Sequence, residues 1–176
     1  VKQTPGLMID LVQVIPGKEY GVMHRQNRSE NEVVVVVKPW SDEKKPVLKE
    51  QYRKAIEDYI EPYRLINTKV TVESARYAGI CVHGKIALDQ DSPKTRKAVL
   101  ERISRELSYT ERKHPFGTVI SYGQLFTALE NTEGVKKVLE LNLERTGNAA
   151  RKNDRGDVLL EADALGILEE TDLEFC

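Results

Sequence analysis

Five consecutive valines, Val33 to Val37, constrain the fold of this chain more than any other feature. Valine is branched at Cβ and favours extended backbone, and an uninterrupted apolar run of this length is typical of a strand that is buried on both faces. Pro39 ends the run. We therefore predict a buried strand. If it lies instead at the edge of its sheet, it needs a partner strand, because an unpaired apolar edge invites aggregation.

After this strand, apolar side chains recur at helical spacing from Val47 until Pro62, which cannot continue a helix. The members of this stripe are Leu48, Tyr52, Ala55, Ile56, Tyr59, Ile60 and Tyr63. We expect its tyrosines to lie in the core or in a subunit interface, because tyrosine combines an apolar ring with a polar tip. Val70 and Val72 then alternate with polar residues, which predicts a strand. Residues 1–73 are interpreted as a first small α/β sub-domain.

Residues 74–176 are interpreted as a second small α/β sub-domain. A turn is expected at Ala75 to Tyr77, and Gly84 inside the next strand predicts a bulge or a close backbone approach. Ser92 and Pro93 form a helix start, with serine as the N-cap and proline at the first helical position. This helix is expected to run to about Tyr109. Its predicted inner face comprises Val99, Leu100, Ile103 and Leu107.

The segment from Pro115 to Leu143 follows as a Phe-Gly turn, a short helix capped by Ser121, a break at Gly134 and an alternating strand. The expected core residues are Leu125, Phe126 and Leu129 of the helix, and Leu139, Leu141 and Leu143 of the strand. The polar segment from Arg145 to Asp157 is expected to be an exposed loop and the best place for a partner contact. Helices and strands mix without regular βαβ alternation, so we predict an α+β fold with mixed sheets and helices packed on one face.

The sequence predicts no catalytic, cofactor-binding or metal-binding residues. His24, His83 and His114 each stand alone, whereas a metal site needs at least three clustered ligands. Cys81 and Cys176 do not form a disulfide framework; they are expected to be a small buried apolar residue and a terminal thiol in a reducing compartment. Nucleophile elbows and phosphate-binding glycine loops are absent from the sequence. We therefore expect a protein that is not an enzyme.

The charge balance is close to neutral, with a net charge of -1, which argues against a broad nucleic-acid footprint. The chain contains no apolar run near the roughly 20 residues that span a bilayer, so we expect neither nucleic acid nor membrane as a partner. It begins without methionine and is expected to be a fragment or a processed product.

Several segments, taken in order, resemble the C-terminal half of the baseplate J-like proteins. These segments are TPGLMIDLVQVIPGKEY, NEVVVVVKPWS, IEPYRLINTKVTVESARYAGICVHGKI and HPFGTVISYGQLFTALENTEGVKKVLELNL. The best matches are Pro62 to Val70 and the Pro-Phe-Gly turn at Pro115. The family usually carries a longer glycine-rich insertion before that turn and a longer N-terminal part.

This resemblance implies a structural component of a contractile phage-tail or prophage-derived baseplate, a wedge protein that acts through protein–protein interfaces. The implied partners are other baseplate, wedge and tail proteins, together with copies of the chain itself in the assembled particle. The implied location is the cytoplasm during assembly and then the virion tail baseplate or a phage-like particle. The alternative from the residues alone is a small-ligand-binding regulatory α+β module, which requires an apolar pocket with a few convergent polar groups.

Overall fold

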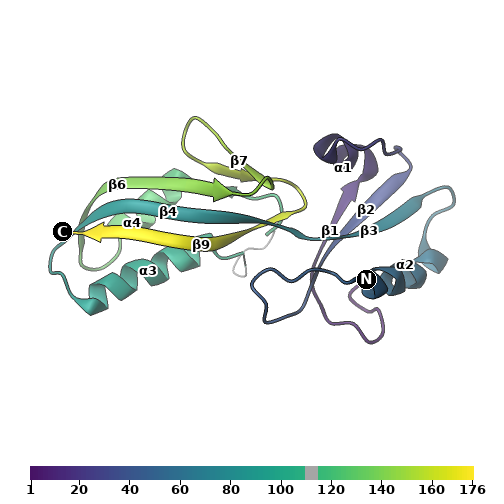
Figure 1. The fold of residues 1–176 in the computed structure, drawn as a ribbon, viewed down its shortest axis with the longest axis horizontal. Helices are drawn as coiled ribbons and strands as arrows, with labels where there is room; N and C mark the ends of the chain where they lie inside the picture. The colour runs from purple at the N-terminus through teal and green to yellow at the C-terminus, as the bar shows by residue number, and fades with distance from the viewer. Residues whose placement is uncertain (110–114) are drawn as a thin grey trace. The chain divides into compact units, whose positions relative to one another are not determined.

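A computed structural model describes residues 1–109 and 115–176. The chain divides into two compact units, Val1–Arg76 and Tyr77–Cys176, and Figure 1 shows that both combine helices with short sheets. The predicted α+β class is confirmed. The turn predicted at Ala75 to Tyr77 is wrong: a single buried residue, Ala75, separates two strands, and its N–H donates to the carbonyl of Val37 at 2.9 Å.

The first unit is built on a three-stranded sheet of order β1-β2-β3. β2 lies in the middle, antiparallel to β1 and parallel to β3. Its elements in chain order are β1 (Ile9–Pro16), α1 (Gly17–His24), β2 (Glu32–Pro39), α2 (Glu50–Ile60), the 3-10 turn η1 (Glu61–Tyr63) and β3 (Lys69–Ser74).

The valine run occupies β2, and four of its five residues are buried on both faces of the strand as predicted; Val33 is half-buried. Val34 to Val37 expose between 0 and 5% of their surface. Val35 and Val37 pack with Ile56 of α2 in one apolar cluster, so the helix shields this face of β2 from water. Val34 and Val36 point to the other face and are just as buried. Because β2 is the central strand, its backbone groups have partners on both sides, and the edge alternative is wrong.

Two predictions for the first unit require correction. The polar, aperiodic sequence from His24 to Asn31 predicts a loop, but His24 is the last residue of the short helix α1, which starts at Gly17 directly after β1. The tyrosines do not lie in the core, because Tyr52 and Tyr63 are exposed and Tyr59 is half-buried; their place in a subunit interface stays a prediction. Only Ile56 of α2 is fully buried, since the helix lies on the edge strand β3 with a narrow face.

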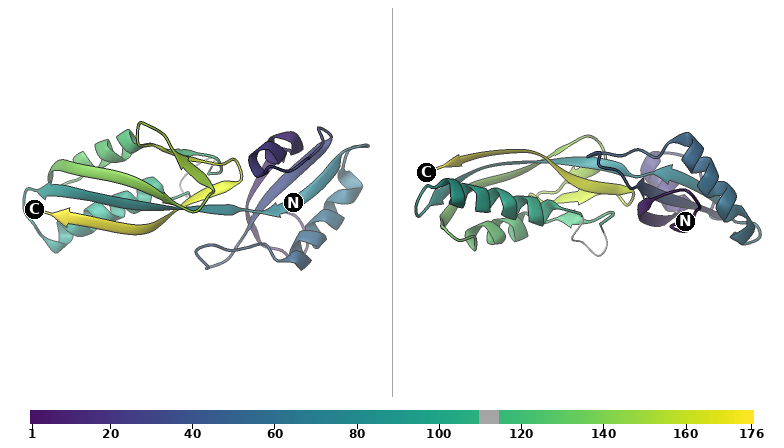
Figure 2. Two further views of the ribbon diagram at one scale, coloured as in Figure 1. Left: turned by 45° about the horizontal axis from the view of Figure 1, so that its top comes forward. Right: turned by 90° about the horizontal axis from the view of Figure 1, so that it is seen from below.

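In its described residues, the second unit contains two three-stranded sheets, of order β6-β4-β9 and β5-β8-β7. Its elements are β4 (Arg76–Leu88), α3 (Pro93–Leu107), β5 (Val119–Ile120), α4 (Tyr122–Glu130), β6 (Val135–Thr146), β7 (Ala150–Lys152), β8 (Val158–Leu160) and β9 (Ala164–Phe175). The right-hand view of Figure 2 shows α3 and α4 on the same side of the larger sheet. Both helices bury their apolar faces in one cluster with β4 and β6.

Serine caps fix where these two helices begin. Ser92 accepts a hydrogen bond from the N–H of Thr95 at 3.2 Å, and Ser121 accepts one from the N–H of Gln124 at 3.4 Å. Both caps match the sequence prediction. The inner faces also match, except that Leu100 is exposed. The preceding Phe-Gly turn buries Phe116, and Gly117 adopts a φ of 61°, which glycine tolerates best.

The strand β6 does not alternate as predicted. The pairing of β6 with β4 is irregular at two positions, between Lys85 and Ile86 and between Ala87 and Leu88 of β4. At each position one residue of β6 has no partner on β4. Each of these irregularities is a β-bulge, which inserts one extra residue and changes the face on which the following side chains lie. Leu143 and Val138 are buried, whereas Leu139 is 47% exposed. The expectation that Leu139 lies on the inner side of the sheet is therefore wrong.

The segment from Arg145 to Asp157 is only partly the exposed loop that its polarity predicted. It contains the end of β6 and the strand β7, and Ala149 and Ala150 are buried. The tip is a tight turn in which the N–H of Asp157 donates to the side-chain oxygen of Asn153 at 2.9 Å. The polar side chains therefore sit on an ordered hairpin.

Candidate interaction surfaces

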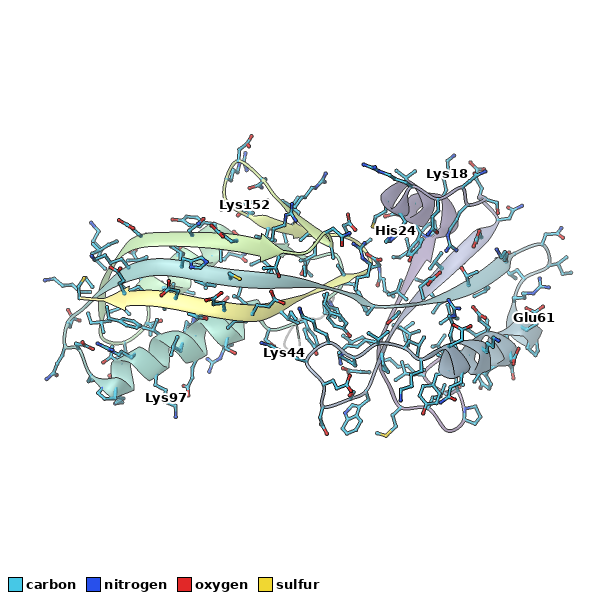
Figure 3. The ribbon with its side chains drawn as sticks, in the orientation of Figure 1. Lys18, His24, Lys44, Glu61, Lys97 and Lys152 are labelled. Carbon is cyan, nitrogen blue, oxygen red and sulfur yellow. The ribbon has the colours of Figure 1, made fainter. Side chains whose placement is uncertain are left out.

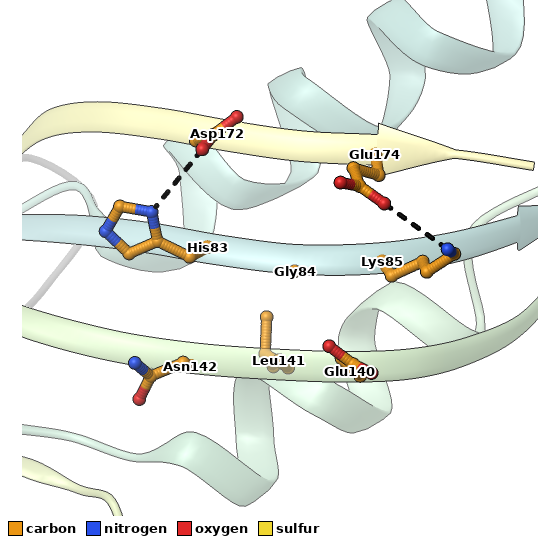
Figure 4. Close-up of a pocket in the computed structure, with 8 residues that line it drawn as sticks. All are labelled: His83, Gly84, Lys85, Glu140, Leu141, Asn142, Asp172 and Glu174. Carbon is orange, nitrogen blue, oxygen red and sulfur yellow. Dashed lines mark ion pairs between the residues drawn. The ribbon is translucent and has the colours of Figure 1, made fainter.

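The face of the β6-β4-β9 sheet that α3 and α4 leave uncovered is polar (Figure 4). It carries a shallow depression of about 260 Å³. Its polar lining residues are His83 and Lys85 of β4, Glu140 and Asn142 of β6, and Asp172 and Glu174 of β9. His83 pairs in register with Asn142 and Lys85 with Glu140, which places each pair on the same face.

Gly84 forms the floor of this depression. A Cβ atom at this position would lie 2.6 Å from the carbonyl oxygen of Glu140, so only glycine lets the two backbones approach this closely. The close approach predicted from the sequence is confirmed.

Two ion pairs cross from β4 to β9 on this face. The Nζ of Lys85 lies 3.3 Å from Glu174, and the Nδ1 of His83 lies 3.9 Å from Asp172. Both carboxylates are largely exposed, so each pair contributes at most about 1 kcal/mol. Outward-facing polar residues are what an antiparallel sheet with one covered face normally presents. This surface suits a solvated or polar contact rather than enclosure of an apolar ligand.

Cys81 and His83 lie two residues apart on β4, which raises the question of thiol catalysis. Burial raises the pKa of the Cys81 thiol, and the charges of Glu170, Glu169 and Glu144 raise it further. A catalytic cysteine needs the opposite environment, one that stabilises the thiolate. The electrostatics therefore disfavour Cys81 as a nucleophile.

The other two histidines, His24 and His114, differ in what the structure describes of them. His24 stacks against Tyr20 with its ring centroid 4.2 Å away, and His114 lies outside the described residues. Across residues 1–109 and 115–176, no group of three or more His, Cys, Asp or Glu side chains could hold a metal ion. Over the same ranges, no helix is long and apolar enough to cross a bilayer.

A charge network in the first unit is structural. Arg28 donates to Glu32 at 2.6 Å, to Thr71 at 2.8 Å and to Glu73 at 3.1 Å. Its guanidinium also lies over the ring of Tyr20. Burial opposes ionisation of Glu32, but the hydrogen bond from Arg28 and nearby positive charge outweigh it, so the pKa of Glu32 lies below its usual range.

Two groups of apolar side chains at the surface were not predicted as groups from the sequence, although Tyr52 and Tyr63 were expected in the core or in a subunit interface. We call the first the apolar turn; it comprises Tyr63, Leu65 and Ile66, which follow α2. The second surrounds a cavity of about 200 Å³, the Trp40 pocket, which is lined by Leu7, Met8, Ile9, Trp40, Leu48 and Tyr52. The adjacent apolar residues Leu65 and Ile66 were the sequence signal for the first group. We interpreted them instead as the segment that leads into the strand around Val70 and Val72.

The predicted partner segment from Arg145 to Asp157 also contributes to the polar sheet face. Lys152, labelled in Figure 3, donates from its Nζ to the side-chain oxygen of Asn142 at 2.7 Å. One basic side chain of the hairpin therefore contacts a residue that lines the depression. A partner contact at this hairpin stays a prediction.

Comparison with solved structures reveals a likeness of fold, whereas no family model and no curated protein matches the chain. The chain is similar to one in the cryo-electron-microscopy structure of the anti-feeding prophage (AFP) baseplate, determined with 6-fold symmetry. The TM-score is 0.58 at 14% sequence identity, and the match covers 80% of this chain and 29% of that chain.

At this identity the likeness is one of fold. It shows that the arrangement of helices and strands in this chain also occurs in a protein of a prophage baseplate. This chain spans less than a third of that protein's length, so the role of the whole neighbour does not transfer directly. Membership of the baseplate J-like family stays a prediction.

Proposed function

We propose that this chain is a structural component of a contractile phage-tail or prophage-derived baseplate and that it serves in wedge assembly through protein–protein interfaces. The observation that carries the proposal is the fold likeness over 80% of the chain to a component of the AFP baseplate. The ordered resemblance of four sequence segments to baseplate J-like proteins points the same way. Its partners would be other baseplate and tail proteins and further copies of itself.

The surfaces of the two units are compatible with this role. The charged face of the β6-β4-β9 sheet and the exposed apolar residues of the first unit both offer contact area. Small-ligand binding, the alternative from the sequence, calls for an apolar pocket with convergent polar groups. The depression in Figure 4 is shallow and lined by charged side chains, and the Trp40 pocket is lined almost wholly by apolar side chains. Neither combines an apolar wall with several convergent polar groups, so neither favours this alternative.

Deletion of the coding region for residues 1–176 in the native gene cluster tests the proposal. We expect negative-stain electron microscopy to show tails that lack assembled baseplates, with assembly restored by the wild-type gene in trans. A tagged chain should also co-purify with tail proteins from the complemented strain. Intact baseplates in the deletion strain would refute the proposal, as would a gene neighbourhood without tube, sheath or spike genes.

A further inference from the structure

The strand β9 forms one edge of the β6-β4-β9 sheet (Figure 1). The N–H of Cys176 donates to the carbonyl of Ile86 at 3.1 Å, and the N–H of Leu88 donates to the carbonyl of Cys176 at 2.9 Å. One residue that bonds to two residues of its neighbour is the parallel pattern, so β9 runs parallel to β4. The ion pair of Lys85 with Glu174 keeps the same register. Among residues 1–109 and 115–176, no strand pairs with the other side of β9.

Successive residues of β9 direct their backbone groups to opposite sides of the strand. The backbone groups of Cys176 point to β4. Those of Thr171, Leu173 and Phe175, each an odd number of residues away, therefore point to the open side of the strand. Backbone N–H and C=O groups at such an edge can pair with a further strand. The last part of β9 thus offers a binding edge for an extended segment.

An edge of the sheet in the first unit differs from this one. The N–H of Val72 in the edge strand β3 donates to the carboxylate of Glu57 in α2 at 3.0 Å, so this backbone group is engaged within the chain. Short strands, proline and lysine are other common ways to protect an edge. β9 is 12 residues long and contains neither proline nor lysine. Its edge is therefore suited to strand pairing.

The side chains of β9 make one face of this edge acidic and the other apolar. Glu170, Asp172 and Glu174 alternate along the strand and are exposed. The last two lie on the polar sheet face of Figure 4, with side chains that are 77 and 75% exposed. Leu173 and Phe175 are half-buried and pack against the apolar cluster below α3 and α4. A strand that pairs with β9 would therefore meet carboxylates on one face and apolar side chains on the other.

Charge complementarity selects the occupant of this edge. If β9 paired antiparallel with β9 of a second copy, carboxylates would lie opposite carboxylates, and like charges directly opposite each other destabilise a sheet. A strand with Lys or Arg at alternate positions would instead place a positive charge opposite each carboxylate. This chain has no three Lys or Arg residues at positions i, i+2 and i+4. The complementary strand is therefore expected in a different protein.

We propose that the edge of β9 from Thr171 to Phe175 binds an extended segment of a different protein in which Lys or Arg alternates with apolar residues. Main-chain hydrogen bonds supply the affinity, and the acidic face selects the basic side chains. The proposal rests on the proposed function only in that the partner would be another component of the particle. The contact is short, so we expect a dissociation constant of about 10 μM to 1 mM for an isolated segment.

Fluorescence anisotropy with labelled peptides of defined sequence provides the first test. We expect the chain to bind the peptide KVKVKVK saturably. The peptide KKVVVKK has the same composition and charge without the alternation, and it should bind at least about tenfold more weakly, because its lysines do not all lie on one face of a strand. The acidic peptide EVEVEVE should not bind. Equal affinity for the two basic peptides would overturn the proposal, because it would show charge attraction without strand pairing.

Charge reversal on β9 tests the selectivity. Asp172→Lys combined with Glu174→Lys should weaken binding of KVKVKVK at least about tenfold and should permit binding of EVEVEVE. Glu130→Lys combined with Glu133→Lys is the matched control, because it changes the net charge equally at exposed positions outside β9. Equal loss of affinity in the two double variants would overturn the proposal.

Removal of backbone donors tests strand pairing without a change of charge. Thr171→Pro removes an N–H that points to the open side, a change that edge strands tolerate, and it should abolish binding of KVKVKVK. Circular dichroism checks that this variant is folded. Two further peptides carry backbone N-methyl groups on the valines or on the lysines, and each blocks one edge of the peptide. At least one of them should lose binding to the wild-type chain. Full affinity of both would overturn the proposal, whether or not Thr171→Pro folds.

The edge contact and the proposed function fail in different experiments. A wild-type chain that does not bind KVKVKVK at about 1 mM, where weak contacts are still detected, would overturn the edge contact. If deletion of the coding region still removes baseplates, the proposed function would remain in place. Peptide binding that meets every expectation above, together with intact baseplates in the deletion strain, would support the edge contact and refute the proposed function.

Discussion

The guanidinium of Arg28 lies 2.6 Å from the carboxylate of Glu32, and both side chains are largely shielded from solvent. Thr71 and Glu73 of β3 bind the same guanidinium and pair in register with Val34 and Val36. Residues paired in register share a face, so Arg28 covers the side of the valine strand that α2 does not. This contact joins the polar segment after α1 to the core of the first unit.

Arg28→Met should destabilise the first unit by about 3 kcal/mol, because it removes the nearest charged partner of the buried Glu32. It leaves Glu32 only Lys69 at 3.6 Å and the hydroxyl of Thr71. Trp40 is the single tryptophan and belongs to this unit, so its fluorescence in a denaturant titration reports the transition. Lys18→Met is the control: the exposed pair of Lys18 with Glu30 should change stability by less than about 1 kcal/mol. Equal effects of the two substitutions would contradict a structural role for Arg28.

The stability of the first unit should depend on pH through Glu32. Because its pKa is lower in the folded chain than in the unfolded chain, the unfolded state binds a proton first as the pH falls. The stabilisation is complete above the unfolded pKa of about 4.3 and is lost as the pH falls through the folded pKa. Glu32→Gln should reduce the slope of unfolding free energy against pH in this acidic window. An unchanged slope in the variant would show that Glu32 does not carry the effect.

The serine cap of α3 should stabilise the second unit. Ser92→Ala removes the acceptor for the N–H of Thr95 and should cost about 1 kcal/mol. Ser104→Ala makes the same chemical change at an exposed position within the same helix, where alanine is well tolerated. Thermal unfolding followed by circular dichroism compares the two variants. A loss of stability in Ser104→Ala as large as in Ser92→Ala would rule out the cap as the cause.

Local signals in the sequence were sufficient for some elements and insufficient for others. Burial of the valine strand and the caps at Ser92 and Ser121 depend on residues near in sequence, and the structure has them as predicted. The exposure of Leu139 depends on bulges opposite β4, which strand pairing decides and local alternation cannot show. The exposure of Ile66 depends on where the chain turns after α2, a tertiary property.

Because of the bulge at Leu139, two leucines of β6 differ in burial, and their substitution should differ in its effect on stability. Leu143 is fully buried, so Leu143→Ala should destabilise the second unit by about 2 to 5 kcal/mol through lost packing and a cavity. Leu139 is nearly half exposed, and Leu139→Ala should change stability by about 0.5 kcal/mol or less. Thermal unfolding followed by circular dichroism measures both. If the strand alternated regularly instead, the two leucines would share the inner face and both substitutions would be severe. That result would show that β6 lacks the bulge at Leu139.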